Sequence, residues 1–441
     1  MQRSLDINSE RFRRISREGG WIFFGQLMAV CGSLVGIRIL TELLSPVAYG
    51  ELALGLTIAA IVNQIILGPL GGGIIRFYSP SIEQQDFWGY WNAVKKMVLL
   101  ATGIILILVV ISVAGLAFAG QAQWITLTIS AFVFAVLSGY CANLSGIQMA
   151  ARQRSIVAIH QGMDPLLRSL MAAGLLLWLG MTSTVAMIGY AFAALLLLGS
   201  QLYFFRRIIV NVNDKKFINT KRDWQNEIWS FSWPIAIFGI FTWMQLASDR
   251  WSLQLFSTTQ EVGKYVVLYQ LGYYPISLIA GMVMQLLLPI LYQRAGDATN
   301  SLRKRDATKL SWQLVWATLG LTMAMVLAAF LLHKWIFQVL VAQEYRSASY
   351  LLPWMILAGG VFASGQALAS NLQAQLKTRD MMAAKIVTAL LGMAFNIIGA
   401  YWYGMTGIVC AWLMFSIVYF LWMIALVHDG RIKEHKILSA S

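Results

Sequence analysis

The sequence predicts an all-α, polytopic membrane protein with about twelve transmembrane helices in two parallel six-helix bundles. Three observations predict this class: the apolar composition, the placement of the basic residues, and a repeat between the two halves of the chain. Hydrophobic residues make up 59% of the 441 residues and charged residues only 12%, whereas a soluble domain usually carries about 25% charged residues. A water-soluble core does not hide so much apolar surface, so we expect lipid to surround the chain.

Apolar stretches follow one another almost from end to end, and each has roughly the 20 residues that a membrane-spanning helix needs. The predicted spans are 19–43, 47–75, 94–118, 122–150, 157–179, 184–205, 228–256, 263–292, 310–332, 348–376, 381–402 and 405–427. They define four regions: an N-terminal six-helix bundle (1–205), a cytoplasmic basic linker (206–227), a C-terminal six-helix bundle (228–427) and a cytoplasmic tail (428–441).

The loops on one side of the predicted spans hold nearly all of the basic residues. If the N-terminus is cytoplasmic, the cytoplasmic segments hold 27 of the 33 Lys and Arg residues, and the opposite loops hold Lys264, Lys334 and Arg346. Cytoplasmic loops of membrane proteins carry such an excess, so we expect both termini in the cytoplasm. The same distribution explains the net charge of +14 without a nucleic-acid partner.

Short motifs recur in the two halves of the chain in the same order. The matching pairs are Gln148–Arg154 with Gln373–Arg379, Gly180-Met181-Thr182 with Gly404-Met405-Thr406, and Tyr49-Gly50 with Val262-Gly263. Because six spans per half is an even number, such repeats run parallel and are related by an axis along the membrane normal. Transporters commonly have this construction, with the substrate site between the halves. Channels and membrane enzymes also contain repeats, so the repeat favours transport without excluding them.

Arg38, Arg168 and Arg250 fall inside predicted spans, where a charge costs about 2.5–3.5 kcal/mol at the bilayer centre. Asp249 and Arg250 lie deep in the seventh span, and adjacent helical residues point about 100° apart, so they do not pair well with each other. Gln245, one turn before Asp249, extends the polar stripe. We expect this stripe to line a substrate cavity; the alternative is a buried structural pair with another helix.

Two further arginines have a carboxylate one helical turn away. Arg38 precedes Glu42, which indicates either a cation that lines the cavity or an interfacial pair that reaches out to the membrane surface. Arg168 follows Asp164, and His160 continues the same stripe. This second group is either a proton relay or a cluster at the cytoplasmic end of its span. Asp164, His160 and Glu42 are therefore the candidate ion-coupling groups.

Arg76 ends the second span, where it either anchors the helix at the interface or lines an inward-open cavity. Gly71–Gly73 before it are no phosphate loop, because no strand precedes them and no GKS or GKT follows; we expect them to loosen the helix end or to pack it closely. The sequence has no Walker A motif, HExxH motif or nucleophile elbow, and its three cysteines lie in apolar runs. We therefore expect no enzyme activity, no metal site and no cofactor.

The chain resembles the polysaccharide-exporting, O-antigen flippase branch of the multidrug/oligosaccharidyl-lipid/polysaccharide exporter superfamily. Four places carry the resemblance: RILTELLSPVAYGELAL in 38–54, IIRFYSP in 74–80, Asp249-Arg250, and the stretch from Gln373 to Trp412. The resemblance implies two six-helix bundles in a V shape around a central cavity that opens alternately to each side of a bacterial cytoplasmic (inner) membrane.

The resemblance also implies the substrate, an undecaprenyl diphosphate that bears an oligosaccharide repeat unit for O-antigen or exopolysaccharide synthesis. Arg38, Arg76, Arg168, Arg250, Asp249 and Gln245 are the candidate substrate-binding residues, and guanidinium groups match phosphate oxygens bidentately. The implied partners are the lipid-linked oligosaccharide, membrane lipid, and the polysaccharide polymerase and chain-length regulator proteins. Two alternatives remain: a multidrug/cation antiporter of the same fold, and a membrane polysaccharide polymerase or ligase, which we would expect to need a larger outer loop.

Overall fold

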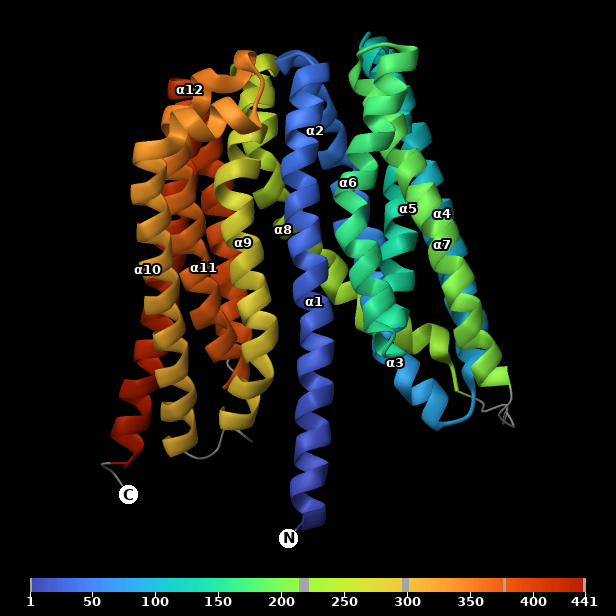
Figure 1. The fold of residues 1–441 in the computed structure, drawn as a ribbon, viewed down its shortest axis with the longest axis vertical. Helices are drawn as coiled ribbons and strands as arrows, with labels where there is room; N and C mark the ends of the chain where they lie inside the picture. The colour runs from blue at the N-terminus through green and yellow to red at the C-terminus, as the bar shows by residue number, and fades with distance from the viewer. Residues whose placement is uncertain (1, 214–221, 296–300, 376–377, 439–441) are drawn as a thin grey trace. The chain divides into compact units, whose positions relative to one another are not determined.

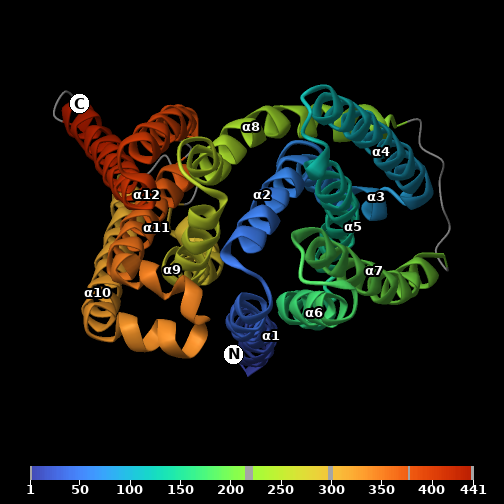
Figure 2. The same ribbon diagram turned by 90° about the horizontal axis from the view of Figure 1, so that it is seen from above.

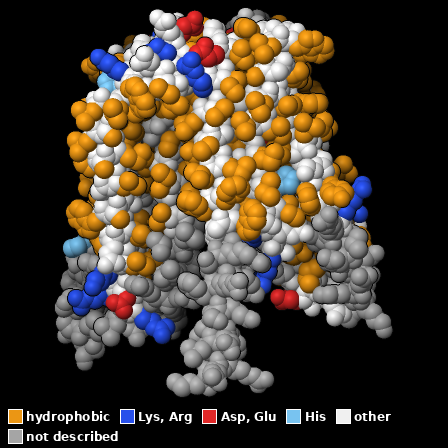
Figure 3. Space-filling view, viewed as in Figure 1, with side chains coloured by type: hydrophobic (Ala, Val, Ile, Leu, Met, Phe, Trp, Pro, Cys, Tyr) orange, Lys and Arg blue, Asp and Glu red, His pale blue; other side chains and the backbone are white. Residues whose placement is uncertain are grey.

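The computed structural model describes residues 2–213, 222–295, 301–375 and 378–438. These residues form helices joined by short turns, with no strand, and they contain eleven helices that are long and apolar enough to cross a membrane (Figure 1). On the face shown in Figure 3, hydrophobic side chains cover the middle of the helices, and most charged side chains lie toward the helix ends. The predicted all-α, multi-pass membrane class is therefore confirmed.

The chain divides into two compact units, Met1–Trp243 and Met244–Ser441. This division falls within the helix Trp224–Phe256 (α8), so that the first part of α8 belongs to the first unit and the rest to the second. The bundle boundaries at 205 and 228 stay a prediction, and residues 214–221 of the expected linker lie outside the described residues.

The first unit has seven α-helices of its own, one π-helical turn and one 3₁₀ turn. These are α1 (Gln2–Leu43), α2 (Pro46–Val62), η1 (Asn63–Leu67), α3 (Gly68–Glu83), α4 (Phe87–Phe118), η2 (Ala122–Trp124), α5 (Ile125–Ala150), α6 (Arg154–Leu179) and α7 (Ser183–Asn213). Helix α1 packs along α6, and α7 packs against both α5 and α6 (Figure 2). The segments α2, η1 and α3 continue one another, so that 46–83 forms one long path through the unit.

Local chemistry sets the helix starts in this unit. The Ser45 hydroxyl accepts a hydrogen bond from the Ala48 amide, and Pro46 occupies the first turn of α2, where its missing N–H costs nothing. The Asp86 carboxylate caps α4 by accepting from the Gly89 amide and also accepts from the Trp224 indole of α8. One carboxylate therefore fixes both the start of α4 and the start of α8.

The first part of α8 runs along the path 46–83 in close backbone contact. Gly73 lies so near α8 that a Cβ there would meet the Ser232 hydroxyl at 2.6 Å. The indole of Trp243 donates to the Thr57 carbonyl at 2.8 Å at the other end of this contact. The glycines before Arg76 thus serve close packing, the second of the two roles expected from the sequence. Glycines commonly allow such approach between membrane helices.

Among the described residues, the second unit contains the rest of α8, four further α-helices and one 3₁₀ segment. These are α9 (Thr259–Ala295), α10 (Ser301–Leu340), η3 (Gln343–Leu351), α11 (Leu352–Ala374) and α12 (Thr378–Leu438). Helix α11 is the most buried of the spans and packs against α9, α10 and α12.

Helix α12 is two helices joined at a sharp reversal. Gly404 has φ 53° and ψ −132°, a backbone conformation outside the helix that glycine adopts without a Cβ penalty. The two arms then lie side by side, because a Cβ on Gly399 would stand only 2.5 Å from the carbonyl oxygen of Gly407. Each arm has the roughly 20 residues of a membrane crossing, and the predicted spans 381–402 and 405–427 fall on the two arms.

The motif repeated between the two halves has an equivalent setting in each unit. Gly180 and Gly404 both have positive φ, 113° and 53°, and each directly precedes the last helix of its half. In the first unit Glu51, near the start of α2, accepts a hydrogen bond from the Ser183 hydroxyl. In the second unit Glu261, near the start of α9, accepts from the Met405 amide. The repeat seen in the sequence therefore corresponds to a repeated contact in the structure.

Candidate functional site

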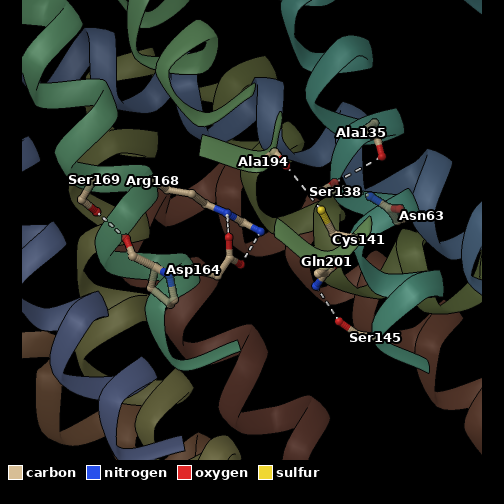
Figure 4. Close-up of polar contacts among 11 residues, drawn as sticks. Asn63, Ala135, Ser138, Cys141, Ser145, Asp164, Arg168, Ser169, Ala194 and Gln201 are labelled. Atoms are coloured by element: carbon tan, nitrogen blue, oxygen red, sulfur yellow. Dashed lines mark hydrogen bonds and ion pairs between the residues drawn. The ribbon is translucent and has the colours of Figure 1, made fainter. Parts of the chain in front are cut away.

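A cavity of about 370 Å³ lies within the first unit, between α5, α6 and α7. Its polar lining includes His160, Asp164 and Arg168 from α6 together with Ser145 and Gln201. Figure 4 shows four of these groups, Ser145 on α5, Asp164 and Arg168 on α6, and Gln201 on α7. The structure thus brings the predicted stripe on α6 together and adds hydroxyl and amide groups from α5 and α7.

Arg168 and Asp164 form a two-point ion pair near the middle of α6. The Arg168 Nε donates to Asp164 Oδ1 at 2.6 Å, and its Nη2 lies 2.5 Å from Oδ2. The guanidinium also lies over the ring of Phe134, 4.8 Å from the ring centroid. About a quarter of each charged side chain remains exposed, 28% and 26%. The pair therefore lies near the middle of α6, which is one of the helices long and apolar enough to cross a membrane. Whether it acts as a relay or as a cluster near the interface stays a prediction.

His160 is held between α6 and α7. Its Nδ1 lies 2.7 Å from the Ile156 carbonyl oxygen, and its Nε2 lies 2.9 Å from the Ser200 hydroxyl. Since the carbonyl only accepts, Nδ1 carries a proton, and Nε2 is left to exchange a hydrogen bond with the hydroxyl. The ring lies on the same cavity as Asp164.

Asp249 occupies a separate polar site inside the second unit. The side chain is fully buried, at 0% exposure. Its Oδ2 accepts from the Tyr265 hydroxyl at 2.6 Å and from the Trp412 indole at 3.3 Å, and its Oδ1 accepts from the Arg250 amide at 2.7 Å. The carboxylate therefore joins α8, α9 and α12.

The Arg250 guanidinium turns away from Asp249 toward α9. It lies over the ring of Tyr269, 5.4 Å from the centroid, which agrees with the expectation that adjacent helical residues do not pair. Within the described part of the chain, its Nε is buried without a hydrogen-bond partner. Gln245, one turn earlier on α8, is half-buried. Arg250 is thus a cation that lies over the Tyr269 ring and has an unused hydrogen-bond donor, its Nε.

Two further sequence candidates, Arg38 near the end of α1 and Arg76 in the middle of α3, lie elsewhere in the first unit. Arg38 pairs with Glu42 at 2.5 Å, and the side chains are 39% and 50% exposed. Arg76 is exposed on α3. Neither arginine lines the cavity that holds Arg168.

Sequence reasoning missed the groups that complete both sites. In the first unit these are Ser138, Cys141, Ser145 and Gln201, of which the first three recur every three to four residues on α5, and this spacing indicates a polar stripe on one helix face. In the second unit they are Tyr265, Tyr269 and Trp412. Tyrosines spaced by four residues in an apolar helix look the same as core or interfacial aromatics, so only the fold identifies them.

Comparison with solved structures shows the same fold. The lipid II flippase MurJ in an inward closed conformation superposes with a TM-score of 0.68 at 14% identity, over 93% of this chain and 87% of that chain. An inward-facing multidrug resistance MATE transporter of the MOP superfamily gives 0.65 at 14% identity, over 91% and 95%. The Vibrio cholerae MATE transporter VcmN gives 0.60 at 14% identity, over 97% and 98%.

The sequence itself matches one family. No curated protein matches the chain in a sequence search, but the profile of the polysaccharide biosynthesis protein family matches residues 15–294, more than half of the chain. Together with the fold of the MOP-superfamily transporters, this match confirms the resemblance drawn from the sequence motifs. The chain is a multi-pass membrane protein that belongs to the polysaccharide biosynthesis protein family.

Proposed function

We propose that this protein is a flippase that moves undecaprenyl-diphosphate-linked oligosaccharide units across the cytoplasmic membrane of a bacterium for O-antigen or exopolysaccharide synthesis. Arg250 is the observation that carries the proposal. Its guanidinium lies within a membrane span, rests on the Tyr269 ring and keeps a buried Nε without a partner. A charge in that position is costly unless a cavity or ligand accommodates it.

A phosphate-bearing substrate suits this arginine chemically. Guanidinium donors match phosphate oxygens bidentately, and a site of low dielectric strengthens the contact. Arg38 and Arg76 are further substrate contacts in the proposal, and so is Arg168, which Asp164 neutralises until an anion competes for it. Gln245 extends the Arg250 stripe with an amide that hydrogen-bonds sugar or phosphate, and Asp249 supports the site through its hydrogen bonds to Tyr265 and Trp412.

The proposal couples transport to an ion through the cavity in the first unit. Asp164 and His160 line that cavity, and Glu42 has the same one-turn relation to an arginine that Asp164 has. In the proposal, a proton bound by Asp164 would release Arg168 for the anionic substrate, so ion binding and substrate binding favour each other. The protein then acts by transport and not by catalysis, with both termini in the cytoplasm, and a polymerase and a chain-length regulator protein work on the delivered units.

The test is export by a deletion strain that carries the wild-type gene or an Arg250 variant. We expect Arg250→Ala to abolish surface polysaccharide, with lipid-linked repeat units accumulating on the cytoplasmic side. Arg250→Lys should rescue export only in part, because lysine keeps the charge without the bidentate fork. The measurements are polysaccharide gels and lipid extraction, with membrane levels of each variant as the control.

Three outcomes would count against the proposal. Wild-type levels of export by a well-expressed Arg250→Ala variant would rule out Arg250 as an essential phosphate contact. Intact surface polysaccharide in the deletion strain, together with altered drug susceptibility, would favour the multidrug antiporter that the MATE-like fold also permits. Polymerisation of repeat units by the purified protein would favour the enzyme alternative.

A further inference from the structure

A second cavity of the first unit, of about 540 Å³, is lined almost entirely by hydrocarbon. Its walls come from η1 and the start of α3, from α4, and from the first part of α8. Several wall residues are also open to the outside of the unit: Leu100 is 59% exposed, Trp229 57% and Trp233 48%. The cavity is therefore a groove that faces the lipid phase.

Charged residues on α4 place this groove at one edge of the hydrocarbon layer. Residues 97–118 contain no charge, and Lys95 and Lys96 directly precede them. Met97 and Ile104 both line the groove, and at 1.5 Å per residue the segment between them is about 10 Å long. The groove thus begins where the lysines mark the membrane surface and runs into the hydrocarbon.

The end of the groove near the surface is polar and cationic. Lys96 is exposed and lies one helical turn before Leu100, on the same face of α4. Gln225 of α8 belongs to the groove wall and lies at the same end, near the start of its helix. This order, a cation and an amide followed by hydrocarbon, complements a lipid with an anionic headgroup.

We propose that this groove binds the isoprenoid chain of the lipid-linked substrate, with the phosphate of that lipid at Lys96. The identification of this lipid rests on the proposed function. The wall consists mainly of aromatic and branched side chains, among them Ile65, Ile66 and Ile104, and β-branched side chains are stiff at χ1. A fixed, irregular wall suits a methyl-branched chain that lies along it. The chain then reaches the bilayer past the exposed indoles of Trp229 and Trp233.

Site-specific photocrosslinking tests the groove in the full-length protein. A benzophenone amino acid replaces Leu100 in one variant and Leu106 in the other; both lie on α4 and are similarly exposed, 59% and 61%, but only Leu100 lines the groove. Each protein is reconstituted in nanodiscs of phosphatidylethanolamine and phosphatidylglycerol with a small fraction of undecaprenyl phosphate. The mass of the adduct distinguishes isoprenoid from phospholipid.

We expect undecaprenyl phosphate adducts to be enriched several-fold at position 100 over position 106, and phospholipid adducts to be equal at the two. Ala236→Phe, which fills the groove from α8, should remove the enrichment, whereas Ile237→Phe on the neighbouring lipid-facing position should not. Equal undecaprenyl phosphate labelling at the two sites, or enrichment of phospholipid at position 100, would overturn the proposal. Crosslinking requires no transport. A negative crosslinking result would therefore contradict the groove without contradicting the export result, and a negative export result would not remove the crosslinks.

Discussion

Asp249 lies fully buried in the core of the second unit without an ion-pair partner among the described residues. Two side-chain donors and one backbone amide surround it, from Tyr265, Trp412 and Arg250. A carboxylate that accepts several hydrogen bonds is stabilised in a medium that otherwise disfavours charge. In the proposal Asp249 therefore fixes the helix contacts, and Arg250, which has a free donor, meets the substrate.

The first prediction compares two substitutions of Asp249. Asp249→Ala leaves the Tyr265 hydroxyl and the Trp412 indole buried without an acceptor, at a cost of about 1–3 kcal/mol for each group. Asp249→Asn keeps one oxygen and should lose less. The thermal unfolding midpoint of the purified protein in detergent is expected to fall most for alanine. Equal midpoints for the two variants would contradict the positioning role.

At the scale of elements, α8 makes its closest contacts through small residues. Gly239 stands against the η1 turn, where a Cβ would approach the Gln64 carbonyl oxygen to 2.1 Å. A π-helical turn such as η1 carries an extra residue in the helix and recurs at functional sites. The contact therefore joins an irregular part of one span to the helix that enters both units.

The second prediction tests this contact with glycine substitutions. Gly239→Ala should destabilise the protein by about 1–3 kcal/mol because the new methyl group meets backbone that has little room to move. Gly115→Ala on α4 is the matched control, since no heavy atom lies within 4 Å of the added Cβ, and alanine favours the helix by about 1 kcal/mol. The two thermal midpoints should move in opposite directions. A shift in the same direction would indicate that α8 does not pack there so tightly.

Over the whole molecule, each half of the chain has one hydrogen bond between a glutamate and the start of the last helix of that half. Glu51 holds the start of α7 through Ser183. Glu261 holds the start of the second arm of α12 through Met405, and also accepts from Ser257. A carboxylate near a helix N-terminus gains from the helix dipole, so each glutamate stabilises the last helix of its own half.

The third prediction concerns these two glutamates. Glu51→Ala and Glu261→Ala should each lower the thermal midpoint, by an amount that corresponds to about 0.5–1.5 kcal/mol for the lost hydrogen bond. Because the contacts lie in separate units, the double variant should show the sum of the two effects. Glu51→Gln keeps an acceptor for Ser183 and is the milder control. A double variant no less stable than the worse single one would show that the two contacts are not independent.

The sequence alone determined where the helices lie. The predicted span 122–150 coincides with η2 and α5, and 228–256 falls within α8 and ends with it. Several helices extend past the predicted spans at their basic ends; α4, for example, begins at Phe87 and not at residue 94. Hydropathy measures the part of a helix that meets lipid, whereas the hydrogen-bonded helix continues into water until a cap such as Asp86 ends it.

Only the tertiary structure decided how the polar groups of these helices are used. The sequence identified Asp164, Arg168, Asp249 and Arg250 because a charge in an apolar run is conspicuous and costly. The spacing also indicated a pair between Asp164 and Arg168 and none between Asp249 and Arg250. It did not indicate that Asp249 bonds to Tyr265 and Trp412 on other helices. Partners on one helix follow from a spacing of four residues, but partners on other helices depend on packing between segments distant in sequence. That packing also forms the groove beside Lys96, which no single helix contains.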